Sequence, residues 1–305
     1  MRATILGSGA GGGFPQWNCG CPNCVAVREG RGGYLPRTQD SVAITEDGDR
    51  FVVINASPDV LVQIQRTRAL WPRSPRHSPI AAIVLTNGDM DHVLRLFSLR
   101  ESYPFALYAT ESVWRGLEAS VFIRTLRRFE GQLEKRVLRL GEDVALADAK
   151  GDALGLRLRA SGAPGKLPVH LVGHASGGAD DNVMLAVAPD KGGASLCYAA
   201  ACASADVDVS GHGAVLFDGT FYREDELVRL GLSKAVAKDM AHVPIAGEGG
   251  SLSKLSSLTT RKIYTHINNT NPILAPGSPE RRAVEAAGWE IAYDGMELEL
   301  DGSRS

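Results

Sequence analysis

Cys19, Cys21 and Cys24 form a cluster near the beginning of the chain. Three thiolates at this spacing can hold one face of a zinc ion from a single turn of the backbone. The alternative is a set of buried, unbridged thiols, but free cysteines rarely cluster in this way. A zinc ion with four protein ligands has no open position for chemistry. We therefore expect a structural zinc that fixes the N-terminal loop and takes a fourth ligand from another segment.

A second set of metal-binding side chains is spread over three segments, each of which follows a short apolar run. These segments are "TNGDMDH" with Asp91 and His92, "DGT" with Asp218, and "HINN" with His266. Short apolar runs are typical of buried strands, whose ends often carry functional residues. Two imidazoles and one or two carboxylates can bind a metal ion and leave coordination positions open. The sequence therefore predicts a second metal site, at which chemistry can take place.

His242 lies in the stretch "DMAHVPIAG", and its role is open. It can be a metal ligand, a general acid or base, or a hydrogen-bonded core histidine, and its expected position in a loop favours a functional role. His170 and His174 are weaker candidates. We expect the other candidates to be structural: His77 and His212 on the surface, Cys197 and Cys202 in buried packing, and Asp180 and Asp181 on a solvated turn.

A glycine-rich loop, "LGSGAGGG", follows the first predicted strand. Gly7, Gly9 and Gly12 match the G-x-G-x-x-G spacing of dinucleotide-binding proteins. In those proteins the loop opens a helix whose N-terminus faces the pyrophosphate. Here Phe14, Pro15 and the cysteine cluster follow at once. We therefore favour a loop whose glycines let the backbone pass close to a neighbouring site.

The hydrophobic pattern predicts the elements that position these residues. Buried strands are expected at Ile80–Leu85, Ala214–Phe217 and Lys262–Thr265. Helices are expected at His92–Leu99, Val113–Phe129, Glu224–Leu230 and Pro279–Ala287, the last capped by Ser278. The proline-rich stretch Arg66–Pro79 is expected to run over the surface. The absence of a sequence repeat of about 20 to 50 residues argues against a solenoid or a propeller.

The composition is that of a soluble globular protein, with 305 residues, a formal net charge of -2 and 44% hydrophobic residues. Because no stretch resembles a linker, we expect a single domain over residues 1–305. We find no signal peptide and no apolar run of ~18 residues, so we expect a cytoplasmic protein without a membrane partner. The near-neutral charge argues against nucleic acid and favours small molecules or peptides as partners.

The stretch "TNGDMDH" resembles the metallo-β-lactamase superfamily motif T-H-x-H-x-D-H, with Asn87 and Asp89 in place of the two leading histidines. Asp218 and His266 resemble the bridging carboxylate and the last histidine of that superfamily. Five stretches are together similar to the pyrroloquinoline quinone biosynthesis protein B family: "GSGAGGGFPQWNCGCPNC", "FDGTFYREDEL", "MAHVPIAGEGGSL", "THINNTNPIL" and "EIAYDGMELEL". The resemblance extends over nearly the whole chain.

The resemblance implies an α/β fold of the metallo-β-lactamase type, a four-layer αββα sandwich with the metal at the edge of the two sheets. It also implies an iron-dependent enzyme that hydroxylates the tyrosine ring of a peptide-derived, cross-linked Glu-Tyr intermediate, with dioxygen as co-substrate and other proteins of the pathway as partners. A related phosphonate-pathway phosphodiesterase completes a similar zinc site with a histidine three positions after its last active-site histidine. That position is Asn269 here. Asparagine is an uncommon zinc ligand, so the fourth ligand stays open.

The two missing histidines indicate which half of a two-metal site is retained. Hydrolases of this superfamily use two ions, and the first depends on the leading histidines. With Asn87 and Asp89 in their places, we expect that first site to be weak. Asp91, His92 and His266 remain, which is close to the two-histidine, one-carboxylate ligand set of non-haem Fe(II) oxygenases.

We therefore hypothesise that Fe(II) binds these three retained residues, with Asp218 as a fourth ligand or as a group that supports a ligand. His242 and Asp89 are the expected catalytic residues, which would relay protons. Because metal selection by ligand type is loose, purified protein can carry zinc in the iron site. Two alternatives are a mononuclear hydrolase acting on an ester, phosphodiester or lactone, and a non-catalytic carrier of the finished quinone. The missing histidines weigh against the hydrolase.

Overall fold

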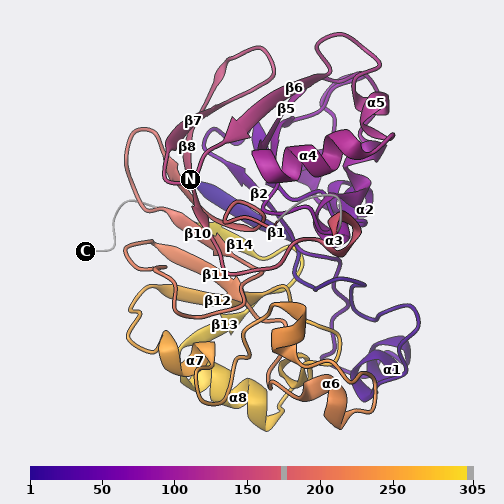
Figure 1. Ribbon diagram of the computed structural model, residues 1–305, viewed down its shortest axis with the longest axis vertical. Helices are drawn as coiled ribbons and strands as arrows, with labels where there is room; N and C mark the ends of the chain where they lie inside the picture. Colours follow the sequence, from indigo (N-terminus) through magenta and orange to yellow (C-terminus); the bar gives the residue numbers. More distant parts are fainter. Residues whose placement is uncertain (173–176, 301–305) are drawn as a thin grey trace.

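Two seven-stranded sheets form the centre of the fold (Figure 1). The computed structural model describes residues 1–172 and 177–300 of the chain. The first sheet contains, in spatial order, β14 (Glu297–Glu299), β1 (Arg2–Gly7), β2 (Ser41–Thr45), β3 (Phe51–Ile54), β4 (Ile80–Val84), β5 (Phe105–Thr110) and β6 (Leu133–Leu138). The second contains β13 (Trp289–Ile291), β12 (Arg261–Thr265), β11 (Ala214–Asp218), β10 (Leu196–Ala199), β9 (Val183–Pro189), β8 (Ala153–Gly162) and β7 (Asp143–Ala147).

The strands that lead to the candidate metal ligands lie in parallel parts of the two sheets. Strand β4 is parallel to β3 and β5, and β11 is parallel to β10 and β12. The three strands predicted from the sequence are confirmed, because β4, β11 and β12 each begin and end within one residue of the expected bounds. Asp218 is paired in register with Thr265. This register places the carboxylate of β11 beside the residue that precedes His266.

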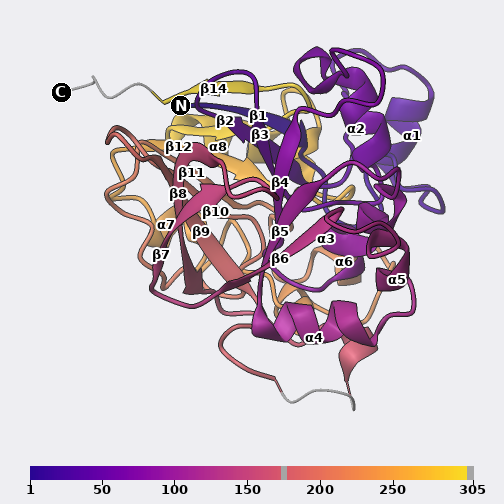
Figure 2. The same ribbon diagram turned by 90° about the horizontal axis from the view of Figure 1, so that it is seen from above.

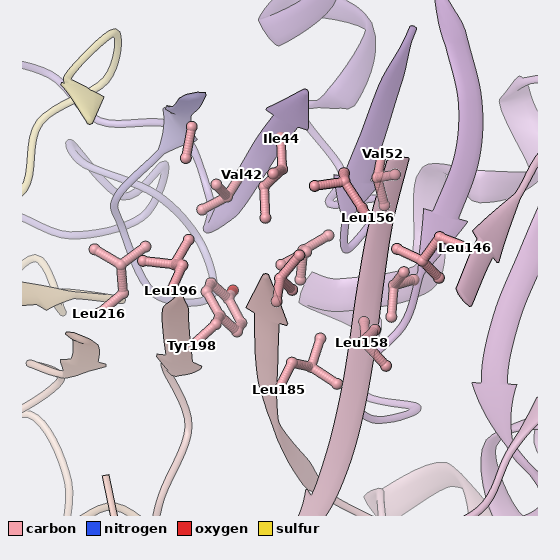
Figure 3. Packing of buried hydrophobic residues seen from close by; sticks show 14 of the residues in the cluster. Val42, Ile44, Val52, Leu146, Leu156, Leu158, Leu185, Leu196, Tyr198 and Leu216 are labelled. Atoms are coloured by element: carbon pink, nitrogen blue, oxygen red, sulfur yellow. The ribbon is translucent and has the colours of Figure 1, made fainter. Parts of the chain in front are cut away.

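The two sheets pack against one another through an apolar core (Figure 3). Strand β8 buries alternate residues, among them Leu156 and Leu158, because successive side chains of a strand point to opposite faces. These leucines belong to one cluster with Val42, Ile44 and Val52 of the first sheet. The apolar faces of the two sheets thus cover each other.

Helices cover the outer face of each sheet (Figures 1 and 2). On the first sheet these are α2 (Val60–Arg66), α4 (Glu111–Ala119) and α5 (Ile123–Leu126), whose side chains pack with those of β4 and β5. On the second sheet they include α7 (Ser251–Lys254) and α8 (Pro279–Ala286), which pack with β11 and β12. The layers therefore follow the order helix, sheet, sheet, helix, which is the expected αββα sandwich.

One long predicted helix was wrong. The stretch Val113–Phe129 forms two helices, α4 and α5, and Ser120 between them has an extended backbone (φ −78°, ψ 130°). The break allows Ile123 and Leu126 to join the apolar cluster over the first sheet. Packing against the sheet therefore overrides the helical periodicity of this stretch.

Two further predicted helices are confirmed in part. The stretch His92–Leu99 is divided between α3 (Met90–Val93) and a 3₁₀ helix, and α6 (Glu226–Arg229) covers only part of Glu224–Leu230. Short 3₁₀ segments are common where an α-helix ends. The first region is helical up to Ser98 but changes from α to 3₁₀ after Val93, whereas the second is a loop with a single helical turn.

The last helix and the proline-rich stretch agree with the predictions. The Ser278 side chain accepts a hydrogen bond from the Arg281 backbone N–H at 3.0 Å and so caps α8. Most of Arg66–Pro79 is exposed, although Leu70, in a short 3₁₀ turn, is buried. In the described part of the chain, no helix has the length and apolar character needed to cross a membrane.

Leu158→Ala would create a cavity between the two sheets. We expect it to lower the free energy of unfolding by about 2–5 kcal/mol, because the lost transfer free energy adds to the cost of the cavity. Leu232→Ala is the matched control, since Leu232 is 50% exposed, and should change stability by less than about 0.5 kcal/mol. Urea unfolding followed by circular dichroism measures both. Equal effects would contradict a stabilising role of the inter-sheet core.

Candidate metal centre

Three strand ends bring the predicted active-site ligands together. Asp91 and His92 lie on α3 after β4, Asp218 is the last residue of β11, and His266 follows β12. The ligand atoms of Asp91, His92 and His266 all lie within 4.8 Å of one another. The same is true of Asp218, His242 and His266. The structure thus adds His242 to the group of side chains around His266.

A cavity of about 240 Å³ opens over these side chains. Besides the metal-binding groups, its walls include Asp89, Lys166, Thr220, Phe221, Met240 and Asn268. The cavity is smaller than the roughly 300–1,000 Å³ typical of sites for drug-sized ligands. It suits a single ring or another small group.

A chain of hydrogen bonds fixes the orientation of His92. Its Nδ1 atom lies 3.2 Å from the Thr86 hydroxyl, and both the hydroxyl and the backbone N–H of Thr86 donate to Asn55 Oδ1 at 3.1 Å. A backbone N–H can only donate, so the Asn55 side-chain atom that it contacts must be the amide oxygen. The Thr86 hydroxyl donates its single hydrogen to the same oxygen. Thr86 therefore accepts from His92 Nδ1–H. Burial lowers the pKa of His92 and so favours the neutral ring, in which Nε2 is then unprotonated. Within the described residues, this buried Nε2 atom has no hydrogen-bond partner.

Thr220 holds His266 in a similar way. The Thr220 hydroxyl donates to the His266 carbonyl oxygen at 3.0 Å and therefore accepts from His266 Nδ1, 2.9 Å away. His266 Nε2 faces Asp91 Oδ2 at 3.3 Å. The His266 backbone has a φ of 53°, a left-handed conformation that costs about 1–3 kcal/mol for a residue with a side chain. The strained turn aims the imidazole at Asp91.

His242 is paired with a buried carboxylate. Its Nδ1 atom lies 2.7 Å from Asp218 Oδ2, and Asp218 also accepts hydrogen bonds from the backbone N–H groups of Cys202 and Thr220. Burial disfavours the ionised form of Asp218, but the interactions with His242 and with His266 lower its pKa overall. With Nδ1 committed to Asp218, His242 keeps Nε2 for a proton or a metal ion.

These side chains fit a divalent cation. Buried polar atoms almost always have a partner, and His92 Nε2 lacks one within the described residues. Burial alone would lower the pKa of His266, but the hydrogen bond and charge of Asp91 and the charge of Asp40 raise it to about 9. The site therefore attracts positive charge, and a metal ion would displace the proton. Asp91, His92 and His266 are the residues that would hold it.

Asn87 and Asp89 stand where the superfamily motif has its two leading histidines, and they lie in different environments. Asn87 Nδ2 donates to Asn182 Oδ1 at 3.1 Å, and Asn87 Oδ1 accepts from the backbone N–H of Asp89 at 3.0 Å. Asn87 also forms a backbone bridge with Asn182. Its amide thus joins this loop to the segment before β9. Asp89 lines the cavity, where burial raises its pKa.

The three clustered thiols lie beside the loop that follows His266. The sulfur atoms of Cys19, Cys21 and Cys24 are within 4.8 Å of one another, and Asn269 Nδ2 lies 3.1, 3.7 and 3.3 Å from them. A half-turn of the asparagine amide exchanges its nitrogen and oxygen with almost no change in shape. In the turned amide, Oδ1 of Asn269 would face the three sulfur atoms in place of Nδ2. Three thiolates and an amide oxygen would give zinc four ligands, and the residues present fit that ion.

The glycine-rich loop passes close to the metal centre. A Cβ atom on Gly11 would lie 3.1 Å from Asp91 Oδ2, which is closer than ordinary van der Waals contact. Gly9 forms a backbone bridge with Ile267, directly after His266. Helix α1 (Pro22–Arg28) begins well after the loop, so the loop does not open a helix. The structure therefore supports a close backbone approach rather than dinucleotide binding.

The other histidines that the structure describes are not among the side chains of the metal centre. His170 is exposed and lines a different cavity, and His174 lies outside the described residues. His77 and His212, expected on the surface, are half-buried. His77 Nδ1 accepts from a backbone N–H, and His212 Nδ1 lies 2.7 Å from the Ser195 hydroxyl. Both therefore serve local structure.

The prediction for the two downstream cysteines is confirmed, whereas that for the aspartate pair is partly wrong. Cys197 and Cys202 are buried, at 2% and 0% exposure, as expected. The solvated turn at Asp180 and Asp181 was wrong for Asp181, which is 5% exposed. Asp181 accepts hydrogen bonds from the Ser112 hydroxyl and from the Gly178 backbone N–H at 2.6 Å. It is a buried group that ties a loop to α4.

Sequence reasoning missed the residues that orient the ligands, chiefly Thr86, Thr220 and Asn55. The first two lie in the same motifs as candidate ligands, "TNGDMDH" and "DGT", which is the one local signal of their role. Asn55 offered no such signal. Phe221 and Met240 of the cavity wall were also not predicted.

Comparison with known proteins gives consistent results. The beta-lactamase superfamily domain matches residues 50–267. Coenzyme PQQ synthesis protein B of Methylobacterium sp. (strain 4-46) is 43% identical, over 98% of this chain and 100% of the relative. The protein of the same name from Rhizobium meliloti (strain 1021) is 41% identical, over 98% of each. The crystal structure of Zn²⁺-bound PqqB from Methylobacterium extorquens matches with a TM-score of 0.89 and 37% identity, over 98% of this chain and 100% of that one.

Removal of one clustered thiol tests the structural zinc site. We expect Cys24→Ser to lose about one zinc equivalent per chain, because two thiolates and an amide hold the ion poorly. Cys197→Ser is the matched control, since Cys197 is also buried but lies on β10, outside the cluster. Elemental analysis after gel filtration measures the metal content. Unchanged zinc in Cys24→Ser would contradict the site.

Thr86→Val tests the orientation of His92. It removes the hydroxyl that accepts from Nδ1 with little change in size, and we expect metal affinity at the cavity to fall by about 10- to 100-fold. Thr86→Ser keeps the hydroxyl and should retain the affinity. Competition with a coloured chelator gives the affinity independently of turnover. If the valine variant binds metal as tightly as the wild type, Thr86 does not orient His92.

Proposed function

The chain belongs to the coenzyme PQQ synthesis protein B family of the beta-lactamase superfamily, and we propose that it is an Fe(II)-dependent oxygenase of pyrroloquinoline quinone synthesis. Its substrate would be the peptide-derived, cross-linked Glu-Tyr intermediate, whose tyrosine ring is hydroxylated with dioxygen as co-substrate. The observation that carries the proposal is the cluster of Asp91, His92 and His266 at one cavity. Two imidazoles and one carboxylate are the ligand set of many non-haem Fe(II) oxygenases.

The surroundings of Asn87 favour a site for one metal ion. A two-metal hydrolase needs a full ligand set for each ion. Asn87 stands where the first leading histidine is expected, and both ends of its amide are engaged in hydrogen bonds. Asp89 supplies a carboxylate rather than an imidazole. These two replacements weaken the ligand set for a second ion and support oxidation over hydrolysis.

When bound, Fe(II) would supply the electron transfer to dioxygen that the reaction needs. One oxygen atom would enter the ring, and two electrons from an external reductant such as ascorbate, with two protons, would convert the other to water. The side chains around it would position the ring and move protons. His242, oriented by Asp218 through Nδ1, can take the proton that a ring carbon loses. Asp89, whose pKa is raised by burial, is the second candidate for proton transfer.

The cavity walls suit the proposed substrate. Phe221 and Met240 offer apolar contact to a phenol ring, and Lys166 can pair with a substrate carboxylate. A volume of about 240 Å³ admits the ring while the rest of the intermediate stays at the mouth of the cavity. Other proteins of the pathway are the proposed partners that deliver the intermediate and accept the product.

We expect the activity to increase with the iron content of the protein and not with its total metal content. The relative from Methylobacterium extorquens was crystallised as a Zn²⁺-bound protein. Imidazole and carboxylate groups bind several divalent ions, and zinc binds such sites more tightly than Fe(II). Zinc in the purified protein would therefore be compatible with an iron enzyme.

The decisive experiment follows oxygen into the ring. Metal-free protein is reconstituted anaerobically with Fe(II) and mixed with the cross-linked substrate, ascorbate as electron donor and isotopically labelled dioxygen. We expect labelled oxygen on the ring by mass spectrometry. His266→Ala should lower iron affinity by at least about tenfold and abolish incorporation. His242→Gln should lower turnover by about 100-fold or more, and its iron content shows whether His242 is also a ligand.

His77→Ala provides the matched control, because His77 is a half-buried histidine away from the cavity. It should incorporate oxygen like the wild type. No incorporation with a filled iron site would contradict the oxygenase. Cleavage of generic diesters with zinc or manganese would favour the mononuclear hydrolase, and tight quinone binding without turnover would favour the carrier.

A further inference from the structure

A cleft lies at the end of the first sheet opposite to the metal centre. An apolar cavity of about 350 Å³ borders Ile80 and Phe105, the first residues of β4 and β5. It adjoins a wider cleft of about 750 Å³, with which it shares Arg76 and Glu101. The metal ligands follow the opposite end of β4. A strand of this length spans about 16 Å at the usual rise per residue, and this length separates the ligands from the apolar cavity. The cleft is therefore separate from the metal centre.

The cleft concentrates positive charge in a chain whose formal net charge is -2. Its walls carry four arginines and one glutamate: Arg76, Arg100, Arg124, Arg128 and Glu101. Within the described residues, none of these four guanidinium groups forms an ion pair, whereas the adjacent Arg127 pairs with Glu118 at 2.9 Å. Their charges are available to an anionic ligand.

Two residues of the cleft have a left-handed backbone. Arg76 and Ser102 have φ values of 60° and 58°. The other non-glycine residues with positive φ, within the described chain, are Asn55, Ala241 and His266. His266 belongs to the metal centre, Ala241 precedes His242, and Asn55 belongs to the hydrogen-bond chain that orients His92. Since strained residues persist mainly at functional sites, this observation independently marks the cleft.

We propose that the cleft binds an acidic peptide segment of a partner protein, with one bulky apolar side chain seated in the adjoining cavity. Arginines pair with carboxylates through two parallel hydrogen bonds, and arginine clusters are a recurrent means of recognising acidic peptides. The cavity walls include Ile83, Leu99 and Phe105, which can enclose a leucine or phenylalanine side chain. The assignment does not depend on the reaction at the metal centre.

The shape of the cleft favours a peptide over other anions. A membrane surface is flat, whereas the arginines line a concave cleft that continues into an apolar cavity. A nucleic acid would need a basic surface that extends beyond the cleft, in a chain of net negative charge. An extended peptide can follow the cleft and place one side chain in the cavity. Phe129, with the Arg128 guanidinium 5.2 Å from its ring centroid, adds apolar contact at the rim.

Fluorescence anisotropy with a labelled probe tests the proposal. The probe is a synthetic peptide of six glutamates around a central phenylalanine, and we expect saturable binding to the full chain. The double variant Arg100→Glu, Arg124→Glu should bind about tenfold or more weakly, because two attractive charges become repulsive. Arg139→Glu is the matched control, since Arg139 is 74% exposed and lies outside the cleft. It should bind like the wild type.

A second probe separates charge from the apolar contact. Replacing the phenylalanine of the peptide by serine should weaken binding about tenfold, because burial of the ring is lost. Absence of saturable binding, equal weakening by Arg139→Glu, or equal affinity of the serine probe would overturn the proposal. Tighter binding of polyphosphate or of anionic phospholipid vesicles would also overturn it. Oxygen incorporation should persist in the double variant, which separates this test from that of the metal centre.

Discussion

One buried carboxylate, that of Asp40, joins the two sheets at the metal centre. Asp40 precedes β2 in the first sheet, is 1% exposed, and accepts hydrogen bonds from Tyr198 of β10 and, at 2.7 Å, from Thr265 of β12. Burial raises the pKa of Asp40 to about 6, and the two hydrogen bonds offset the cost of burying its charge. Tyr198 also accepts from Asn55 at 3.1 Å, which begins the chain that orients His92. Both sheets therefore contribute to the position of the ligands.

This rigid frame allows the centre to keep unfavourable local conformations. Asn55 and His266 both have a left-handed backbone, and each costs about 1–3 kcal/mol. The apolar core between the sheets and the buried hydrogen bonds hold the surrounding chain in place. His92 and His266 have their Nδ1 atoms engaged by Thr86 and Thr220 before any ion binds. A metal ion would therefore meet ligands that need little rearrangement.

The sequence was informative where the signal is local. The apolar runs predicted β4, β11 and β12, which are confirmed. The family and its αββα fold were expected from the resemblance of five stretches along the chain, and both are also confirmed. The orienting residues were not predicted, because Thr86 acts through Asn55, 31 positions away, and Tyr198 reaches Asp40 across 158 positions. Hydroxyl and amide groups gain such roles only in the folded chain. The burial of Asp181 was not predicted for the same reason, because its contact with Ser112 exists only in the folded chain. The oxygenase reaction and the ligand roles stay predictions.

The loop after β12 connects the two candidate metal sites. His266 faces the cavity, and Asn269, three residues later, faces the three thiols. Asn271 anchors the loop from its other end by donating to the carbonyl oxygen of Gly219 at 2.8 Å. A zinc ion held by the thiols and Asn269 would restrain the middle of the loop and would help to hold His266 in its strained conformation. A zinc ion at this place would therefore contribute to function, because it would stabilise the backbone from which a candidate active-site ligand projects.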